Sequence, residues 1–283
     1  MVTLVFGGTG KVGAAAAKRL VDSDKTVRIY SRAPDKVAAI SPKIEAYAGD
    51  LDNPGDFGGA FRDVDSVILI TQVNANEEAR ALPVVAAANN AGVKYITFLS
   101  LVQGPWSDSI PFYKSKLAIE AAIRASGMAW SVVRAAGFMQ TDATLKSEIL
   151  EKGVFSPPIG DVGVARVDTR DVGYAMAEAT LTKAEGEFRV FGPDILTGES
   201  VAAIYTRVLG KPVKYLGNDL EKWAAFKNGA FPPWSLNALH NMYAYSQRIG
   251  MVPEKGEAQC KLMPPKPRTF EAFATELKAA WGA

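Results

Sequence analysis

The feature that most constrains this chain is a glycine-rich turn close to its start. Residues 7–13 (GGTGKVG) follow the apolar run 2–6 (VTLVF) and lead into an alanine-rich stretch. An apolar run closed by glycines predicts a buried strand, and residues 11–21 predict a helix. Between a strand and a helix, glycines spaced G-x-x-G-x-x-G indicate a tight turn that approaches a pyrophosphate. A Walker A loop is excluded, because Val12 rather than serine or threonine follows Lys11.

Predicted strands and helices alternate through the first half of the chain. The strands are expected at 2–6, 26–30, 44–47, 66–70, 95–99 and 129–134, and the helices at 11–21, from Pro34, at 76–91 and at 111–126. Such alternation implies βαβ units and a parallel sheet covered by helices on both faces. We therefore expect an α/β fold with a doubly wound parallel sheet of the Rossmann type.

The end of the second predicted strand decides between two dinucleotides. An NAD-binding Rossmann unit places a carboxylate there to accept from the ribose 2′-hydroxyl. This strand instead ends with Ser31 and Arg32, and Lys36 follows one turn into the next helix. A guanidinium binds a phosphate through two hydrogen bonds, and a serine hydroxyl can donate beside it. The pattern therefore predicts NADP as the cofactor, although Lys36 is as readily a solvated helix residue.

Composition excludes several other classes of function. The net charge is +2, which gives no broad field for nucleic acid or an anionic membrane. No stretch reaches the ~18 apolar residues of a membrane span, and the start lacks the pattern of a signal peptide. Cys260 is the only cysteine, so an intramolecular disulfide is impossible, and no metal-ligand spacing is present. These features favour a cytoplasmic protein that acts as a monomer or homodimer on a small molecule.

Further motifs resemble the NmrA-like group of atypical short-chain dehydrogenases/reductases over nearly the whole chain. They are the turn itself, Gly49-Asp50-Leu51, residues 126–134 (SGMAWSVVR), Phe138-Met139 and residues 167–172 (VDTRDV). The resemblance extends to quinone and dye reductases, phenylcoumaran and isoflavone reductases and ergot-pathway dehydrogenases. It implies that Asp50 meets the adenine edge. The chain departs from the family pattern at Ala135 and Gln140, where proline and asparagine are usual.

Helix phase selects one lysine as the candidate for chemistry. The Tyr-x-x-x-Lys pair of standard short-chain dehydrogenases is missing, since Tyr113 and the two nearby lysines lack the i, i+4 spacing. Lys116 shares a helix face with apolar residues, whereas Lys114 points about 200° away. The resemblance to phenylcoumaran and isoflavone reductases, which carry a catalytic lysine on this helix, also selects Lys116. Two readings remain open: Lys116 as acid, electrostatic group or ribose contact, and Lys116 paired with Glu120.

The remaining site assignments complete this hypothesis. Tyr113 is a second candidate proton donor, although a core position is the commoner role for such a residue. The expected cofactor-binding residues are Gly7, Thr9, Gly10, Lys11, Val12, Gly13, Ser31, Arg32, Lys36, Asp50, Leu51, Thr71, Gln72 and Lys116. The expected substrate-binding residues are Ser100, Phe138, Met139, Trp223 and Trp234.

The second half of the chain differs in texture from the first. Prolines cluster, aromatic residues become frequent, and predicted strands are fewer. We expect an NADP-binding Rossmann domain over 1–155 and a smaller, mainly substrate-binding lobe over 156–283, from which one strand returns to the main sheet. The predicted function is an NADPH-dependent reductase that transfers hydride to a conjugated or aromatic acceptor such as a quinone, enone or iminium. The alternative is a non-catalytic protein that senses NADP(H) and acts through a protein partner.

Overall fold

The computed structural model describes residues 2–104, 107, 110–227 and 229–283. The chain divides into two compact units that we describe separately. Unit 1 comprises residues 1–135, 169–190 and 259–265, and unit 2 comprises residues 136–168, 191–258 and 266–283.

Unit 1 is built on a parallel sheet that the described residues form from seven strands in the order β3-β2-β1-β4-β5-β6-β9. In chain order these are β1 (Val2–Phe6), β2 (Thr26–Ser31), β3 (Glu45–Ala48), β4 (Val64–Leu69), β5 (Tyr95–Leu101), β6 (Ala129–Ala135) and β9 (Gly186–Val190). The central strands are buried because helices cover both faces of the sheet, so they read as nearly continuous apolar runs. The doubly wound α/β fold expected from the sequence is confirmed.

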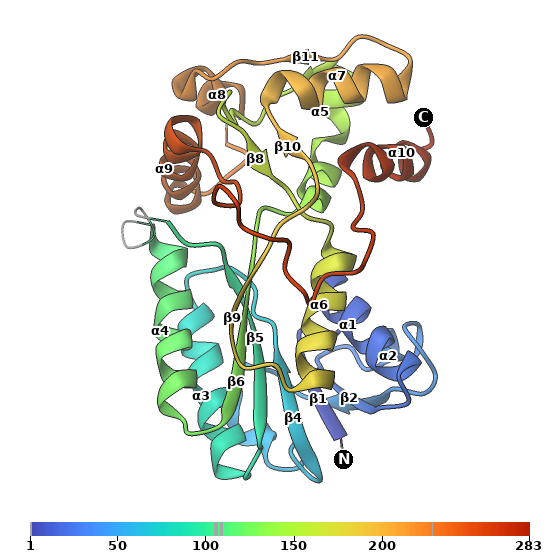
Figure 1. The fold of residues 1–283 in the computed structure, drawn as a ribbon, viewed down its shortest axis with the longest axis vertical. Helices are drawn as coiled ribbons and strands as arrows, with labels where there is room; N and C mark the ends of the chain where they lie inside the picture. Colours follow the sequence, from blue (N-terminus) through green and yellow to red (C-terminus); the bar gives the residue numbers. More distant parts are fainter. Residues whose placement is uncertain (1, 105–106, 108–109, 228) are drawn as a thin grey trace. The chain divides into compact units, whose positions relative to one another are not determined.

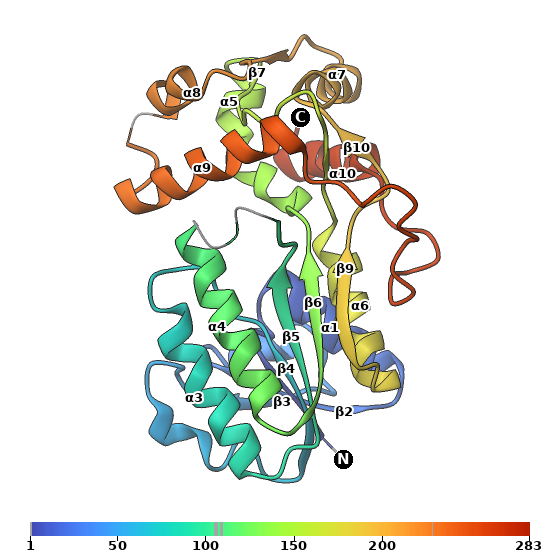
Figure 2. The same cartoon turned by 60° about the vertical axis from the view of Figure 1, so that its left-hand side comes forward.

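Helices form a layer on each side of this sheet (Figures 1 and 2). They are α1 (Lys11–Asp22), α2 (Asp35–Ala38), α3 (Glu77–Asn90), α4 (Pro111–Ala125) and α6 (Thr169–Thr182). α3 and α4 share one face with the main apolar core, where Val84 and Ile119 pack against sheet residues such as Phe98. α1 and α6 cover the opposite face (Figure 1). The carboxyl ends of the strands lead into loops, and the glycine turn is the loop between β1 and α1.

Unit 1 is completed by a later part of the chain. β9 pairs with β6 along Ser131 to Ala135, so a strand does return to the main sheet. α6 packs closely on α1, since a Cβ at Gly173 would lie 2.6 Å from the carbonyl oxygen of Val12. A single cut after residue 155 therefore does not describe the units. The first segment of unit 1 ends at residue 135, and residues 169–190 rejoin it because they supply a strand and a covering helix.

Unit 2 combines helices with short strand pairs. Its elements are α5 (Lys146–Leu150), β7 (Val154–Phe155), β8 (Val164–Ala165), β10 (Ile195–Leu196), α7 (Gly198–Leu209), β11 (Lys214–Tyr215), α8 (Leu220–Lys227), α9 (Pro233–Ile249) and α10 (Phe270–Trp281). α7 shows clear end signals: Thr197 accepts the Ser200 N–H at its start, and Gly210 adopts φ +71° at its end. Tyr205 and Phe270 lie at the centre of a separate apolar core. None of the helices in the described residues is both long and apolar enough to cross a membrane.

Candidate functional site

The glycine turn between β1 and α1 has the geometry of a phosphate cradle. Gly7 has φ +74°, and a Cβ there would lie 2.4 Å from the carbonyl oxygen of Ile70. A Cβ at Gly13 would lie 2.3 Å from the Gly7 oxygen, so α1 can approach the turn only without that atom. Gly10 differs, because its Cβ would meet only the Gly7 oxygen, at 3.3 Å. Gly7 and Gly13 therefore fix the backbone, whereas Gly10 keeps space clear above it.

The start of α1 offers backbone donors to an anion. Gly10 is its N-cap, and no side chain in the described structure caps it. The first N–H groups of a helix have no partner within the helix and carry its positive dipole end. Lys11 is exposed there, while Val12 and Gly13 are buried beneath the turn. This end of α1 therefore suits a pyrophosphate.

A cavity of about 460 Å³ lies in unit 1 beside this turn. Ten of the expected cofactor residues line it: Gly7, Thr9, Gly10, Ser31, Arg32, Lys36, Asp50, Leu51, Thr71 and Gln72. Residues that were not expected from the sequence also line it, namely Tyr30, Ala33, Gly49, Ile70, Glu77 and Arg80. Lys11, Val12, Gly13 and Lys116 are not among its lining residues. The loops after β1, β2, β3 and β4 thus meet around one space at the carboxyl ends of the strands.

One end of this cavity is cationic. Arg32 lies beyond the end of β2 with its side chain 73% exposed, and its Nη1 is 3.9 Å from Oδ2 of Asp50. The exposed Lys36 follows on α2. Ser31 Oγ accepts the Ala33 N–H at 3.0 Å, which keeps the hydroxyl hydrogen available to an anion. The loosely held guanidinium and the hydroxyl fit a 2′-phosphate.

Tyr30, a lining residue, explains the Gly-Asp pair after β3. A Cβ at Gly49 would lie 2.2 Å from the ring of Tyr30, so only glycine admits this ring. The Tyr30 hydroxyl donates to the Asp50 carbonyl oxygen at 3.0 Å. Arg80 reaches the same rim from α3 and forms two hydrogen bonds, of 2.6 and 2.7 Å, with Asp52. Neither Tyr30 nor Arg80 carried a sequence signal, because an aromatic strand residue and a helix arginine are common in structural roles.

Lys116 lies in a buried polar cluster rather than on the cavity wall. It is 2% exposed, and its Nζ lies 2.7 Å from Glu77 Oε1 and donates to the carbonyl oxygen of Leu99 at 2.8 Å. Thr71 Oγ1, at 3.2 Å from this Nζ, donates to Glu77 Oε1 at 2.5 Å. Burial lowers the pKa of the Lys116 ammonium, and the opposing effect of Glu77 is smaller. Lys116 thus contacts two residues, Thr71 and Glu77, that do line the cavity.

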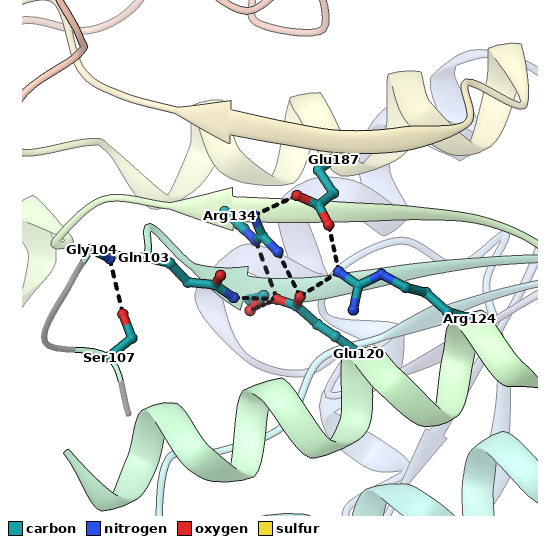
Figure 3. A network of polar contacts seen from close by, with 8 residues as sticks. Gln103, Gly104, Ser107, Glu120, Arg124, Arg134 and Glu187 are labelled. Carbon is teal, nitrogen blue, oxygen red and sulfur yellow. Dashed lines mark hydrogen bonds and ion pairs between the residues drawn. The ribbon is translucent and has the colours of Figure 1, made fainter. Parts of the chain in front are cut away.

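Glu120 forms a different network, which Figure 3 shows. Its carboxylate accepts from Arg134 at 2.7 Å and from Arg124 at 2.8 Å, and both arginines also bind Glu187 on β9. Burial would raise the pKa of Glu120, but the hydrogen bonds from Arg134 and Ser100 hold it below its ordinary value. The pairing of Lys116 with Glu120 considered from the sequence is therefore not the one the structure forms.

Ser100 and Tyr113 are both buried. Ser100 is fully buried, and its hydroxyl donates to Glu120 at 2.6 Å, so it does not line either cavity described here. Its strand-end position suggested a pocket residue, but the nearby carboxylate takes its hydrogen. Tyr113 is 3% exposed and its ring lies 5.1 Å from that of Phe112. Lys114 is exposed, as the helix phase requires.

Unit 2 contains its own cavity, of about 450 Å³. Its lining is mostly apolar and includes Phe138, Leu145, Ile159, Trp223, Phe231, Leu239, Met242 and Tyr243. The Trp223 ring lies 5.1 Å from that of Tyr243 and 6.2 Å from that of Phe231. Met139 is fully buried in the neighbouring core instead. The side chain of Trp234 lies outside the described residues.

The polar groups on this wall differ in how well they are paired. Arg166 binds Asp142 through hydrogen bonds of 2.6 and 3.0 Å and also donates to the carbonyl oxygen of Phe138 at 3.0 Å. Tyr205 donates to the same Asp142 carboxylate at 2.7 Å. Trp223 Nε1, by contrast, is buried and has no hydrogen-bond partner among the described residues. The cavity therefore has aromatic walls, and Trp223, one of its lining residues, has a buried indole N–H without a partner among the described residues.

Comparison with known proteins agrees with this architecture. The model of the NmrA-like family matches residues 2–274. The chain is 29% identical to an NAD(P)H azoreductase of Xenophilus azovorans over 99% of both chains. It is 35% identical to (4-alkanoyl-5-oxo-2,5-dihydrofuran-3-yl)methyl phosphate reductase of Streptomyces griseus, over 81% of this chain and 82% of that protein. The solved NADPH-dependent quinone oxidoreductase of Escherichia coli, complexed with NADPH, superposes with a TM-score of 0.85 at 21% identity, over 98% of this chain and 99% of that one. The chain belongs to the NmrA-like family.

Proposed function

We propose that this protein is an NADPH-dependent reductase that transfers hydride to a conjugated or aromatic small molecule. The observation that carries the proposal is the unit 1 cavity. This cavity is lined by the glycine turn, which leaves space above Gly10, and by the exposed Arg32. Arg32 lies at the end of β2, where no carboxylate is present. The two relatives compared above are named as reductases, an NAD(P)H azoreductase and a (4-alkanoyl-5-oxo-2,5-dihydrofuran-3-yl)methyl phosphate reductase.

Each part of the cavity then binds one part of NADPH. The N–H groups at the start of α1 bind the pyrophosphate, and Arg32 and Ser31 bind the 2′-phosphate, with Lys36 adding charge. Asp50 and Leu51, after β3, border the adenine. When bound, NADPH supplies the hydride, and the reduction of the acceptor also consumes one proton.

Unit 2 supplies the acceptor site in this proposal. Its cavity has walls from Phe138, Trp223 and Tyr243, which suit a flat aromatic molecule. Trp223 Nε1, the unpaired buried donor, fits an oxygen or nitrogen acceptor atom such as a quinone carbonyl or an azo nitrogen. Arg166 and Asp142 bind each other, so they fix the cavity wall rather than the ligand.

Lys116 is a positioning residue in this scheme. Its ammonium holds Thr71 and Glu77, and both of these line the cofactor cavity. Because burial lowers its pKa, the ammonium is also a better proton donor than an exposed lysine. Tyr113 is buried beside Phe112 and does not line the cofactor cavity.

The decisive experiment measures cofactor choice and turnover together. Titration should show tighter binding of NADPH than of NADH. Arg32→Ala should remove most of that difference, about 2 kcal/mol for a lost charge-assisted contact. Arg62→Ala, a replacement of an exposed arginine outside the cavity, is the control. NADPH oxidation should then be followed at its absorbance against quinones, enones, imines and azo dyes.

Two results would contradict the proposal in different ways. Equal affinities of the unmutated protein for NADPH and NADH would refute the assignment of Arg32. Tight NADPH binding without oxidation by any acceptor in the panel would refute the reductase and favour a sensor that reports NADP(H) through a protein partner.

A further inference from the structure

Glu77 has one carboxylate oxygen that the fold does not use. The residue begins α3 and is fully buried. Its Oε1 receives the Lys116 ammonium at 2.7 Å and the Thr71 hydroxyl at 2.5 Å. Its Oε2 is buried and has no hydrogen-bond partner among the described residues. A buried charged oxygen without a donor is costly, so such an atom indicates a donor that arrives with a ligand.

The unused oxygen belongs to a residue of the cofactor cavity. Glu77 lines this cavity together with Thr71 and Gln72, whereas Lys116 does not. Lys116 therefore fixes Glu77 from the protein side. One carboxylate oxygen of this lining residue is therefore held by the lysine, and the other has no partner among the described residues.

The order of the strands indicates which part of NADPH reaches Glu77. In the sheet, β2, β1 and β4 are consecutive neighbours. Arg32 follows β2, the glycine turn follows β1, and Glu77 follows the loop after β4. A dinucleotide with its 2′-phosphate at Arg32 and its pyrophosphate at the turn continues across the strand ends toward β4. The nicotinamide half is therefore the part that comes to Glu77.

We propose that Glu77 is a cofactor-binding residue whose Oε2 accepts a hydrogen bond from the nicotinamide half of NADPH. A carboxylate oxygen accepts from O–H and N–H donors, and this half offers both, as ribose hydroxyls and a carboxamide. The proposal rests on the proposed function, and it gives Lys116 the task of holding this carboxylate in place. In the proposed binding mode, the N–H groups of the turn and of Arg32 bind the phosphates, so they do not donate to Glu77 Oε2.

The test is Glu77→Gln, with two ligands titrated against wild-type and variant protein. Lys116 and Thr71 require an acceptor, so the glutamine keeps its oxygen toward them and turns its NH₂ group to the cavity. A donor then faces a donor of the ligand. NADPH affinity should fall about 10- to 100-fold, the range of a lost hydrogen bond to a charged group. Binding of 2′,5′-ADP, which carries the 2′-phosphate and lacks the nicotinamide half, should change less than about 2-fold.

Two controls make this test specific. Glu78→Gln alters the next, exposed carboxylate on the same helix and should leave both affinities unchanged. If Glu77→Gln does not fold, the double variant Glu77→Leu/Lys116→Met removes both charges and the acceptor, and it should show the same difference between the two ligands.

The outcomes separate the inference from the function on which it rests. Equal loss of NADPH and 2′,5′-ADP affinity would overturn the inference, because it would show a general distortion of the cavity. Unchanged NADPH affinity in a folded Glu77 variant would overturn it as well. Wild-type protein that binds neither ligand would instead overturn the proposed function.

Discussion

Replacement of Lys116 by methionine should destabilise the protein strongly. Methionine keeps most of the side-chain volume, so the main change is the loss of the ammonium that faces Glu77. The two groups are 2.7 Å apart, and the side chains are 3% and 0% exposed. A single replacement would leave the Glu77 carboxylate buried without its counter-charge, which is among the most costly changes a fold can suffer.

The separation of the two groups sets the size of the effect. Unit charges 2.7 Å apart at an effective dielectric constant of ~20 attract each other by about 6 kcal/mol. Part of this lost attraction is offset, because the variant has no ammonium to desolvate on folding. The expected loss of unfolding free energy is therefore about 3–5 kcal/mol. The double variant Lys116→Met/Glu77→Leu, which removes both charges, should regain most of the loss and lie within about 2 kcal/mol of wild type.

Urea unfolding followed by circular dichroism measures these differences. Lys114→Met is the matched control, because this lysine lies on the same helix and is exposed, and it should change stability by less than about 0.5 kcal/mol. A loss below about 1 kcal/mol for Lys116→Met would refute the reasoning. The reasoning would also be refuted if the double variant lost as much unfolding free energy as the two single variants together. That result would show that the two charges are not coupled.

Three further predictions test other parts of the structure. Gly10→Val should abolish NADPH binding but leave the protein folded. A Cβ at this position meets only one backbone oxygen, at 3.3 Å, whereas the added methyl groups fill the pyrophosphate position. Calorimetric titration that still shows binding would contradict this. Glu120 should make the free energy of unfolding depend on pH, because the fold lowers its pKa. Its contribution to stability is complete above pH 4.5 and is lost as the pH falls through the pKa of the folded state. Glu120→Gln should make the free energy of unfolding in urea less dependent on pH below 4.5, while Glu78→Gln should not. Trp223→Phe should raise the acceptor KM about fivefold, for a hydrogen bond worth ~1 kcal/mol, whereas Trp281→Phe, outside the cavity, should leave KM unchanged.

Local patterns account for what the sequence predicts well. The glycine turn and Arg32 are adjacent to strand ends, and short-range rules fix both the backbone and the neighbouring charge. The strands were found with ends shifted by one or two residues, as for 66–70 against Val64–Leu69. Helix phase placed Lys116 on the apolar face of its helix, and it is buried there together with Ile119 and Ile123.

Contacts between distant residues account for what the sequence does not predict. Glu77 and Glu78 look equivalent in the sequence, yet one is buried against Lys116 and the other is exposed. Helix phase places Glu77 on the buried stripe of α3 with Ala81 and Val84, but its pairing with a lysine on another helix is a contact that no local pattern carries. α9 was not predicted from the sequence, although Pro233 stands at its first helical position, where proline favours a helix start.

The division of unit 1 into separate segments has a consequence during translation. When residues 1–135 have left the ribosome, β6 has no partner on its outer side, because β9 spans Gly186–Val190. The surface of α1 that later receives Gly173 is bare at the same time. At ~5–20 residues per second, the nascent chain carries this open strand edge for several seconds. An unpaired edge of a sheet is a template for pairing with other chains, so the nascent chain is most exposed to such pairing until residues 186–190 are made.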